Sequence, residues 1–339
     1  MSDTTATVNR ADSVDLGGAW GVGFDYFDAN SAERKEIMAA NATLERDEWE
    51  TLTDRMVSTY EETLVGIQDL RSAGLTRNVS LATIVDLWQE RSAMTDAEVS
   101  MDGEAASEED RSTYETTGVP VPIVHKDFRI PERELRASRK MGNDLRGDDI
   151  FAATRSVTEM LEYLLFNGWE SSVGTGRGET YQLYGYTNVP TNTDVPGAGD
   201  FSTASNIRPT IIDTIDAFDA NERTAGNFAF YFSPPQWREL RSAVDPDGDG
   251  NMNLRQRLSE EFAQEIGAFR RAPFLDDGEA VAVDLSMDVV ELAEAEDVQT
   301  IEWQSGSGMT NHFKVMAALA PEIKADPEDN SGVVHITGI

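Results

Sequence analysis

The sequence contains no cysteine, only five lysines and no long apolar run. The absence of cysteine excludes disulfides, a cysteine nucleophile and cysteine-ligated zinc. No stretch approaches the length of about 18 apolar residues that a membrane-spanning helix needs, so we expect no membrane contact. The N-terminus has neither the basic nor the apolar region of a signal peptide. Clusters of Lys and Arg are also scarce, which argues against an unassisted nucleic-acid binder.

Acidic residues are abundant instead. The 339 residues include 62 Asp and Glu against 28 Lys and Arg, which gives a net charge of −34. The acids are spread along the chain, and 40% of the residues are hydrophobic, so we expect a folded protein with one large or two ordinary domains rather than disorder. Strongly hydrated carboxylates keep a surface solvated in concentrated salt, which screens their repulsion. The composition therefore predicts a halophilic host.

The N-terminal part divides into three segments. Residues 1–30 are polar and then rich in Gly and aromatic residues, which is typical of an arm without regular structure. Apolar residues recur at three- and four-residue steps through 31–73, which predicts helix ending near Gly74. Within residues 76–118, the run from 96 to 115 holds eight acids, and this composition predicts a long excursion from the body of the protein.

The remainder predicts an α+β fold with helices first and strands after. We expect a strand over 119–130, a helix over 149–167 capped by Asp148 and Asp149 and ended by Gly168, and a helix that starts at Pro209. A serine cap and a first-turn proline, Ser233 and Pro234, predict another helix. Further strands are expected at 227–232, 280–285, 289–292, 298–303, 313–318 and 333–336.

Signals of catalysis are weak. His125, His312 and His335 lie in or beside expected strands, and none has a second histidine at metal-ligand spacing, so we interpret them as structural. The Gly-rich run 174–178 follows a helix and lacks a Lys-Ser/Thr pair, so it is a connector rather than a phosphate loop. Carboxylates are too abundant for any pair to stand out. We therefore predict no catalytic residue and no organic cofactor.

One loop has the pattern of a cation site. Residues 245–253 place oxygen ligands at alternate positions with a glycine at the sixth, as in the first part of a calcium loop. The twelfth position is Gln256 instead of a bidentate glutamate. Two interpretations stay open, a structural turn rich in Asp and Asn or a weak divalent-cation site for Ca²⁺ or Mg²⁺. The candidate ligands are Asp245, Asp247, Asp249 and Asn251.

The order of these segments resembles a known family. An acidic excursion leads into a strand ending Phe128-Arg-Ile, a long helix ends in Glu162-Tyr-Leu-Leu-Phe-Asn-Gly168, and Phe228-Ala-Phe-Tyr-Phe-Ser-Pro-Pro-Gln-Trp237 precedes a β-rich end. This resembles the major capsid proteins of tailed double-stranded DNA viruses with the Hong Kong 97-type fold, and their relatives the encapsulin shell proteins. No single motif is diagnostic, but order and spacing together are specific over residues 75–320.

The resemblance implies a division of the chain. It assigns 1–30 to an N-arm, 31–75 to an N-terminal helical region, and 76–118 to an extended loop that reaches over a neighbouring subunit. Residues 119–206 and 305–339 become a peripheral domain with 149–167 as its spine helix. Residues 207–304 become the axial domain, whose tips meet at the centres of capsomers.

The resemblance also implies a function without catalysis. It predicts a structural protein that self-assembles through hexameric and pentameric capsomers into an icosahedral shell. The shell encloses DNA without sequence specificity, carries cement or turret proteins as candidate partners, and belongs to a virion assembled in the host cytoplasm. The first alternative is an encapsulin-type nanocompartment around cargo enzymes. The long acidic loop favours the virus capsid over this alternative. The second is a halophilic hydrolase, which predicts a monomer or small oligomer.

Two features of the sequence concern the contacts between subunits of such a shell and its contact with DNA. Some family members cross-link through a lysine in the extended loop, but this chain has no lysine between residues 36 and 125, so we predict non-covalent wrapping in high salt. The densest basic patch precedes the expected spine helix. It is interpreted as intersubunit salt bridging in preference to a DNA-facing surface. Its residues are Arg133, Arg136, Arg139, Lys140 and Arg146.

Overall fold

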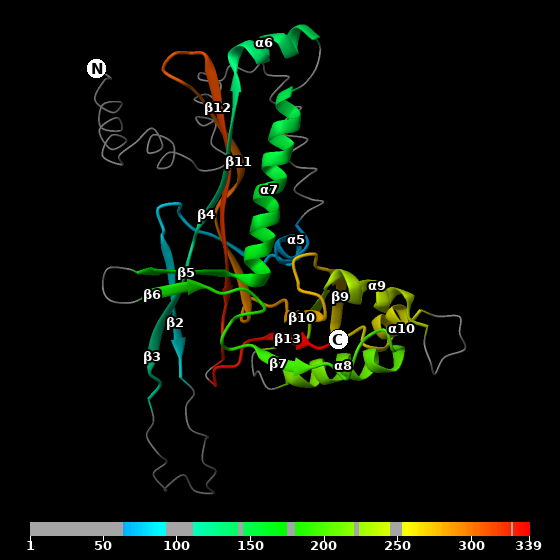
Figure 1. The fold of residues 1–339 in the computed structure, drawn as a ribbon. Helices are drawn as coiled ribbons and strands as arrows, with labels where there is room; N and C mark the ends of the chain where they lie inside the picture. The colour runs from blue at the N-terminus through cyan, green and yellow to red at the C-terminus, as the bar shows by residue number, and fades with distance from the viewer. Residues whose placement is uncertain are drawn as a thin grey trace, which may run out of the picture.

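The computed structural model describes residues 64–92, 111–141, 145–174, 180–219, 224–244, 253–326 and 328–339. Within these ranges the chain forms two main β-sheets and two separate hairpins. Figure 1 shows the first sheet beside one long helix, and the second sheet with three helices as a lobe at its base. The α+β class predicted from the sequence is confirmed.

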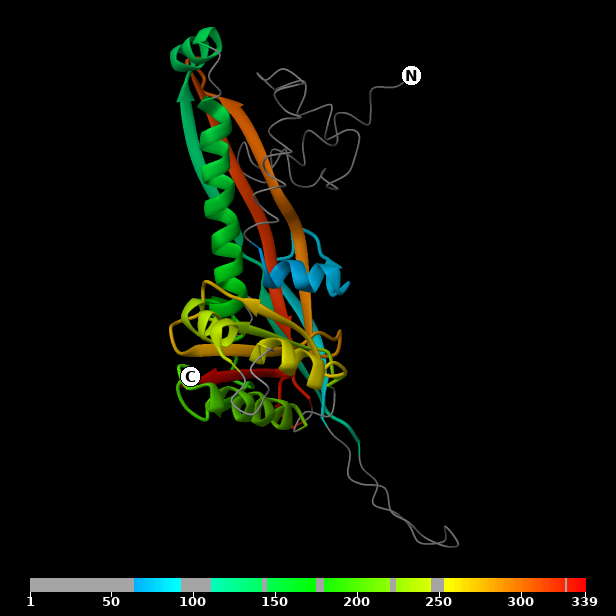
Figure 2. The same cartoon turned by 90° about the vertical axis from the view of Figure 1, so that its right-hand side faces the viewer.

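The first sheet has the strand order β1-β11-β12-β4. Its strands are β1 (Thr76–Asn78), β11 (Val290–Gln304), β12 (Thr310–Ile323) and β4 (Ile123–Pro131). Helix α7 (Leu145–Asn167) runs along this sheet, and α6 (Glu132–Met141) lies at its far end (Figures 1 and 2). Val157, Leu161 and Leu165 are buried at four-residue spacing, which places them on one face of α7 against the sheet.

The second sheet has the strand order β7-β13-β10-β8-β9. Its strands are β7 (Thr193–Pro196), β13 (Val333–Thr337), β10 (Glu279–Asp284), β8 (Phe228–Phe232) and β9 (Ile266–Arg271). Every residue of β8 is buried, because Tyr231 faces the core shared with α7 while Phe230 faces a second core under the helices. Those helices are α8 (Ala204–Phe218), α9 (Pro234–Ser242) and α10 (Leu254–Glu261).

Three smaller elements surround the junction of the sheets. Strands β2 (Val85–Arg91) and β3 (Tyr114–Pro120) form a hairpin that projects from the body, and β5 (Trp169–Gly174) pairs with β6 (Thr180–Leu183). Helix α5 (Gly66–Ser72) lies between α7 and β11. No helix in the described ranges is long and apolar enough to cross a membrane.

Several expected elements differ at their boundaries. The strand expected over 119–130 is divided between β3 and β4 at the Pro120-Val121-Pro122 turn, where two prolines remove backbone donors. The helix expected from Asp149 begins at Leu145, so Asp148 lies in its first turn. Pro209 is the sixth residue of α8 instead of starting it. The two strands expected at 289–292 and 298–303 form one strand, β11.

The ranges of residues that belong to each sheet also differ from the expected domain ranges. Residues 193–196 and 333–337, expected in the peripheral domain, pair with each other in the second sheet, because β13 lies between β7 and β10. Residues 290–304, expected in the axial domain, pair with β12 in the first sheet. Residues 76–78, expected at the start of the extended loop, pair with β11 in the first sheet. The N-arm and most of the N-terminal helical region lie outside the described residues.

Candidate functional site

The backbone at the start of α5 is held by one buried carboxylate. Glu162 of α7 is fully buried, and its Oε1 accepts hydrogen bonds from the backbone nitrogens of Val65 at 3.1 Å and Gly66 at 2.6 Å. Its Oε2 accepts a third from Ile67 at 3.4 Å. Burial raises the pKa of Glu162 to about 7 although these donors act to lower it. The first backbone donors of α5, which have no partner inside the helix, are thereby satisfied by α7.

A second carboxylate joins α5 to the second sheet. Asp69 accepts a hydrogen bond from the Tyr231 hydroxyl at 3.1 Å and is bound by Nε and a terminal nitrogen of Arg270, each at 3.1 Å. Tyr231 comes from β8 and Arg270 from β9. The hydrogen bond to Asp69 raises the pKa of Arg270 above its usual value, so this cation stays charged beside α5.

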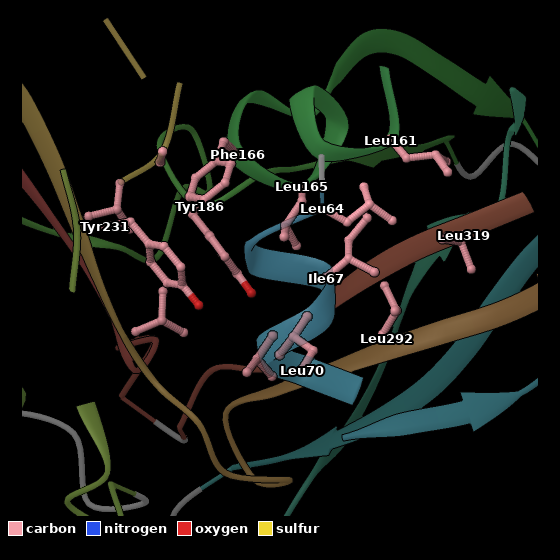
Figure 3. Packing of buried hydrophobic residues seen from close by; sticks show 14 of the residues in the cluster. Leu64, Ile67, Leu70, Leu161, Leu165, Phe166, Tyr186, Tyr231, Leu292 and Leu319 are labelled. Carbon is pink, nitrogen blue, oxygen red and sulfur yellow. The ribbon is translucent and has the colours of Figure 1, made fainter. Parts of the chain in front are cut away.

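Aromatic rings fill the space between these carboxylates. Phe166 meets Tyr186 and Tyr231 edge to face, with ring centroids 5.6 and 5.3 Å apart. Figure 3 shows both tyrosine hydroxyls pointing towards α5, with Leu64 and Ile67 of the α5 region beside Leu165. The Tyr186 hydroxyl is buried and has no hydrogen-bond partner among the residues that the structure describes, and burial raises the pKa of both tyrosines well above the usual value. Ring packing thus joins α7 to β8.

The end of α7 is shaped by the next residues. The Asn167 side chain donates to the Phe274 carbonyl at 3.0 Å, and Gly168 adopts a φ of 67°. A Cβ on Gly168 would lie 2.5 Å from the Leu183 carbonyl oxygen, so glycine is required for both conformation and space. The seven residues Glu162–Gly168, expected as the end of the spine helix, therefore make three contacts. Glu162 bonds the backbone of α5, Phe166 packs against two tyrosines, and Asn167 bonds the Phe274 carbonyl.

An ion cluster holds the base of the β2–β3 hairpin. Arg77 of β1 bonds Asp86 of β2 at 2.7 Å, Glu322 of β12, and Glu291 of β11 at 3.5 Å. Lys324 also reaches Glu291, at 2.9 Å. Burial raises the pKa of Glu322 to about 7 although Arg77 acts to lower it. Arg77 therefore ties the hairpin to two strands of the first sheet.

These groups form a structural joint. Both buried carboxylates are saturated by donors, and the described residues contain no group of three His, Asp or Glu arranged to hold a metal ion. The joint connects α5, the first sheet, α7 and the second sheet. Its chemistry can fix the relative orientation of these elements and of the segments that leave them.

The predicted cation ligands Asp245, Asp247, Asp249 and Asn251 lie outside the described residues, so the cation site stays a prediction. In the basic patch, Arg133 and Arg136 are exposed on α6, and Arg136 pairs with Glu132 at 2.8 Å within that helix. Arg139 and Lys140 belong to α6 and Arg146 to α7, but their side chains are outside the description. The role of the patch also stays a prediction.

The three histidines lie on strands, as predicted. His125 is 3.5 Å from Asp127 on β4, and the His312 ring stacks on Trp303 with centroids 5.3 Å apart. His335 lies 3.2 Å from Asp194 of β7. Each ring therefore lies beside a side chain of its own or a neighbouring strand.

The residues that make the joint were not singled out from sequence, apart from Glu162. Asp69, Arg77 and Arg270 are ordinary surface types in a chain with 62 acids and 23 arginines. Their partners lie up to 245 residues away, so no local spacing identifies them. The one usable signal was an acidic residue placed in the apolar end of a helix.

Comparisons with known proteins agree on the fold. A family model described as "Family of unknown function (DUF6260)" matches residues 38–336. A search of curated proteins found no match. Among solved structures, "The capsid of Myoviridae Phage XM1" is 13% identical, covers 81% of this chain and 93% of its own, and has a TM-score of 0.64.

Two further structures extend this likeness. The "virus-like particle from Pyrococcus furiosus" is 15% identical, covers 85% of this chain and 98% of its own, and has a TM-score of 0.59. The "Capsid of native GTA particle" is 13% identical with a TM-score of 0.57, covering 81% of this chain and 91% of its own. The chain therefore has the Hong Kong 97-type fold that the sequence predicted.

Proposed function

Because this chain belongs to the DUF6260 family of unknown function and has the fold of capsid proteins, we propose that it is a shell-forming major capsid protein. The observation that carries the proposal is a likeness that spans more than nine tenths of two of the solved chains, one from a phage capsid and one from a virus-like particle. The function is structural, without catalysis.

The finer proposal is an icosahedral virion shell around double-stranded DNA, built from hexameric and pentameric capsomers of a tailed virus. The host is a halophilic archaeon, and the net charge of −34 supports this part. DNA is held without sequence specificity, and cement or turret proteins remain candidate partners. The protein then belongs to the virion after assembly in the host cytoplasm.

The two sheets support a revised division of the subunit. The peripheral domain comprises the first sheet with α6 and the spine helix α7. The axial domain comprises the second sheet with α8, α9 and α10, including β7 and β13. The β2–β3 hairpin forms the described base of the extended loop, and residues 1–30 form the N-arm.

Non-covalent wrapping holds this shell. The extended-loop segment contains no lysine, so the side chain that family members use for cross-linking is missing there. Exposed apolar residues on and beside the hairpin, Ile84, Leu87 and Tyr114, supply surface for a neighbouring copy instead. A fully denaturing gel of purified shells should show monomers, and a ladder of covalent multimers would contradict this part.

A nanocompartment is the second candidate, because the likeness to the virus-like particle covers 98% of that chain. Cryo-electron microscopy of the protein expressed in a halophilic host, with nuclease-protected DNA and enclosed proteins measured on the same particles, separates the two. Shells with DNA support the virion, and shells with a stoichiometric enzyme support the compartment. A monomer in molar salt would contradict both and favour the halophilic hydrolase.

The loop at residues 245–253 is proposed to bind a divalent cation near the capsomer centre through Asp245, Asp247, Asp249 and Asn251. Several acidic loops at one axis repel, and a bound cation relieves that repulsion. Chelation in molar NaCl should lower the thermal stability of shells, and re-addition of Ca²⁺ or Mg²⁺ should restore it. Equal stability with and without chelator would contradict the site.

A further inference from the structure

The β2–β3 hairpin meets the first sheet through one face. Asp86 and Trp88 lie two positions apart on β2 and so point to the same side, and Val119 of β3 is paired with Asp86. Trp88 and Val119 pack in an apolar cluster with Ala318 and Ala320 of β12. Among the described residues, Asp86 supplies the one ion pair between the hairpin strands and the first sheet. The base of the hairpin is therefore held by an apolar contact and a single ionic contact.

The ionic contact contains more carboxylates than cations. Arg77 of β1 bonds Asp86 at 2.7 Å and also bonds Glu322, and its Nε lies 3.5 Å from Glu291. Glu291 and Glu322 are cross-strand partners on β11 and β12, and Lys324 bonds Glu291 at 2.9 Å. In the described part of the chain, these are the charged groups that surround Glu322. With all of them ionised, three negative charges meet two positive ones, and a single proton makes the cluster neutral.

Glu322 is the group placed to take that proton. Its side chain is 1% exposed, against 13% for Asp86 and 11% for Glu291. Burial raises the pKa of Glu322 to about 7, and a hydrogen bond with Asp86 acts in the same direction although Arg77 acts to lower it. The protonated carboxyl can donate to Asp86. The ionised carboxylate repels Asp86 and competes with it for the same terminal nitrogen of Arg77.

We propose that the carboxyl groups of Glu322 and Asp86 form a proton-operated hinge at the base of the β2–β3 hairpin. With the proton in place, Glu322 donates to Asp86 and the hairpin is held against β12. When the proton leaves to solvent, both carboxylates need Arg77, and Asp86 moves away with the hairpin because it is the more exposed of the two. Acidic conditions therefore fix the hairpin, and alkaline conditions release it.

Proton linkage gives the direction and the size of the effect. In the open hairpin Glu322 is hydrated and has lost Asp86, so its pKa returns towards the ordinary 4.5. Between this value and about 7, the closed form binds more protons than the open form. Raising the pH therefore favours opening, by at most about tenfold per pH unit from this one group.

The hinge goes beyond the proposed shell function, because it belongs to a single subunit. Only its consequence rests on that function. The hairpin forms the described base of the extended loop and projects from the first sheet (Figures 1 and 2). Its direction therefore decides how the loop meets a neighbouring copy, and pH becomes a control on that contact.

Hydrogen exchange of full-length subunits in molar salt tests the hinge. Protection factors correct for the intrinsic effect of pH on exchange, and they are measured at about pH 5.5 and about pH 8 for β2, β3 and the reference strand β8. Protection of β2 and β3 should fall at least about tenfold relative to β8 at the higher pH. An equal change in the hairpin and in β8 would overturn the proposal.

Substitutions identify the group that responds. Glu322→Gln should abolish the response, because its amide donates to Asp86 at every pH and cannot ionise. Asp86→Asn should abolish it as well, since no charge then faces Glu322, and it replaces the first variant if that variant does not fold. Glu162→Gln is the matched control, because it removes the other buried carboxyl with a pKa of about 7 from a different contact, with α5. The hairpin of this control should respond like the wild type. A response that survives Glu322→Gln, or one that Glu162→Gln removes, would show that the hinge is wrong.

Distances provide a second readout that a change in stability alone would not move. The chain has no cysteine, so Gln89→Cys on β2 and Met160→Cys on α7 give two exposed sites for spin labels. The distribution of distances should be narrow at about pH 5.5 and broad at about pH 8, and Glu322→Gln should keep it narrow at both. A wild-type distribution that does not change with pH would overturn the hinge. Failure of the wild type to form shells would overturn the proposed function and leave these measurements on the subunit unaffected.

Discussion

The Glu162 carboxylate and the Gly66 backbone nitrogen are 96 residues apart in sequence and 2.6 Å apart in the structure. This bond places the start of α5 against α7 at the point where the two sheets meet. Segments that precede α5 therefore leave the body from a position that α7 fixes. In a shell protein held by wrapping, the direction of such a segment decides which neighbour it reaches.

The pH dependence of stability should reveal Glu162. Burial raises its pKa from an ordinary 4.5 to about 7, so between these values the folded state binds more protons than the unfolded state. The free energy of unfolding should then fall as pH rises from about 4.5 to 7, by at most about 1.4 kcal/mol per pH unit from this group. Urea unfolding of the subunit at fixed salt, followed by circular dichroism, measures this slope.

Glu162→Gln should flatten that slope, since the amide does not titrate. Glu322 has a pKa raised to about 7 in the same direction, so the single variant retains part of the slope and Glu162→Gln with Glu322→Gln retains least. Glu159→Gln is the control, because Glu159 lies on the exposed face of α7 and pairs with Arg155 in solvent. A slope unchanged by Glu162→Gln would contradict the buried carboxylate.

Gly66 should not tolerate a side chain. A Cβ there would lie 2.6 Å from the Leu165 side chain and 3.3 Å from the Glu162 Oε1 atom. Gly66→Ala should therefore lower the free energy of unfolding by about 1–3 kcal/mol through overpacking. Gly306→Ala is the matched control, because nothing lies within 4 Å of its Cβ position. Equal unfolding midpoints for the two variants would show that α5 can move away from α7.

Part of this architecture was predictable from local sequence and part was not. The end of α7 at Gly168 and the strand before Ser233 follow from local patterns, and both are confirmed. The sequence pattern predicts two strands, at 289–292 and 298–303, and the residues between them include Glu294 and Asp297. The structure continues the strand through register shifts at these positions, where Arg71 binds both acids. Arg71 is 223 residues from Glu294 in the sequence, so the local pattern around β11 cannot indicate this ion pair.

The sheet that the chain's end joins could not be predicted from the sequence, for a related reason. Val333 to Thr337 have the alternation of any strand, which specifies a strand but not its sheet. The pairing with β10 depends on the distant register of Ala280 with Ile336. The candidate cation loop and the side chains of Arg139, Lys140 and Arg146 lie outside the described residues, so both predictions stay predictions.

Arg77 should control the hairpin that forms the base of the extended loop. Arg77→Met leaves the buried Glu322 without its cation, which should lower the free energy of unfolding by about 1–3 kcal/mol, because Arg77 is itself partly exposed and Glu322 can take up a proton. Arg77→Met with Glu322→Met removes both charges and should recover much of this loss. Hydrogen exchange should accelerate in β2 and β3 in the single variant. Exchange that increases equally in β8 would indicate general destabilisation and contradict a local role for Arg77.

Salt should control the assembled shell more than the folded subunit. Each copy carries a net charge of −34, so the proposed shell brings many like charges close together. The screening length is about 3 Å at molar salt and about 8 Å near physiological salt, so dilution lets the charges of neighbouring copies repel over a longer distance. Light scattering of purified shells should therefore fall on dilution from about 3 M to about 0.15 M NaCl, while the secondary structure of the released subunits is retained. Sucrose at matched osmolarity is the control for swelling. Shells that keep their size and thermal stability in dilute salt would show that subunit contacts outweigh the repulsion, and the acidic composition would then bear on solubility alone.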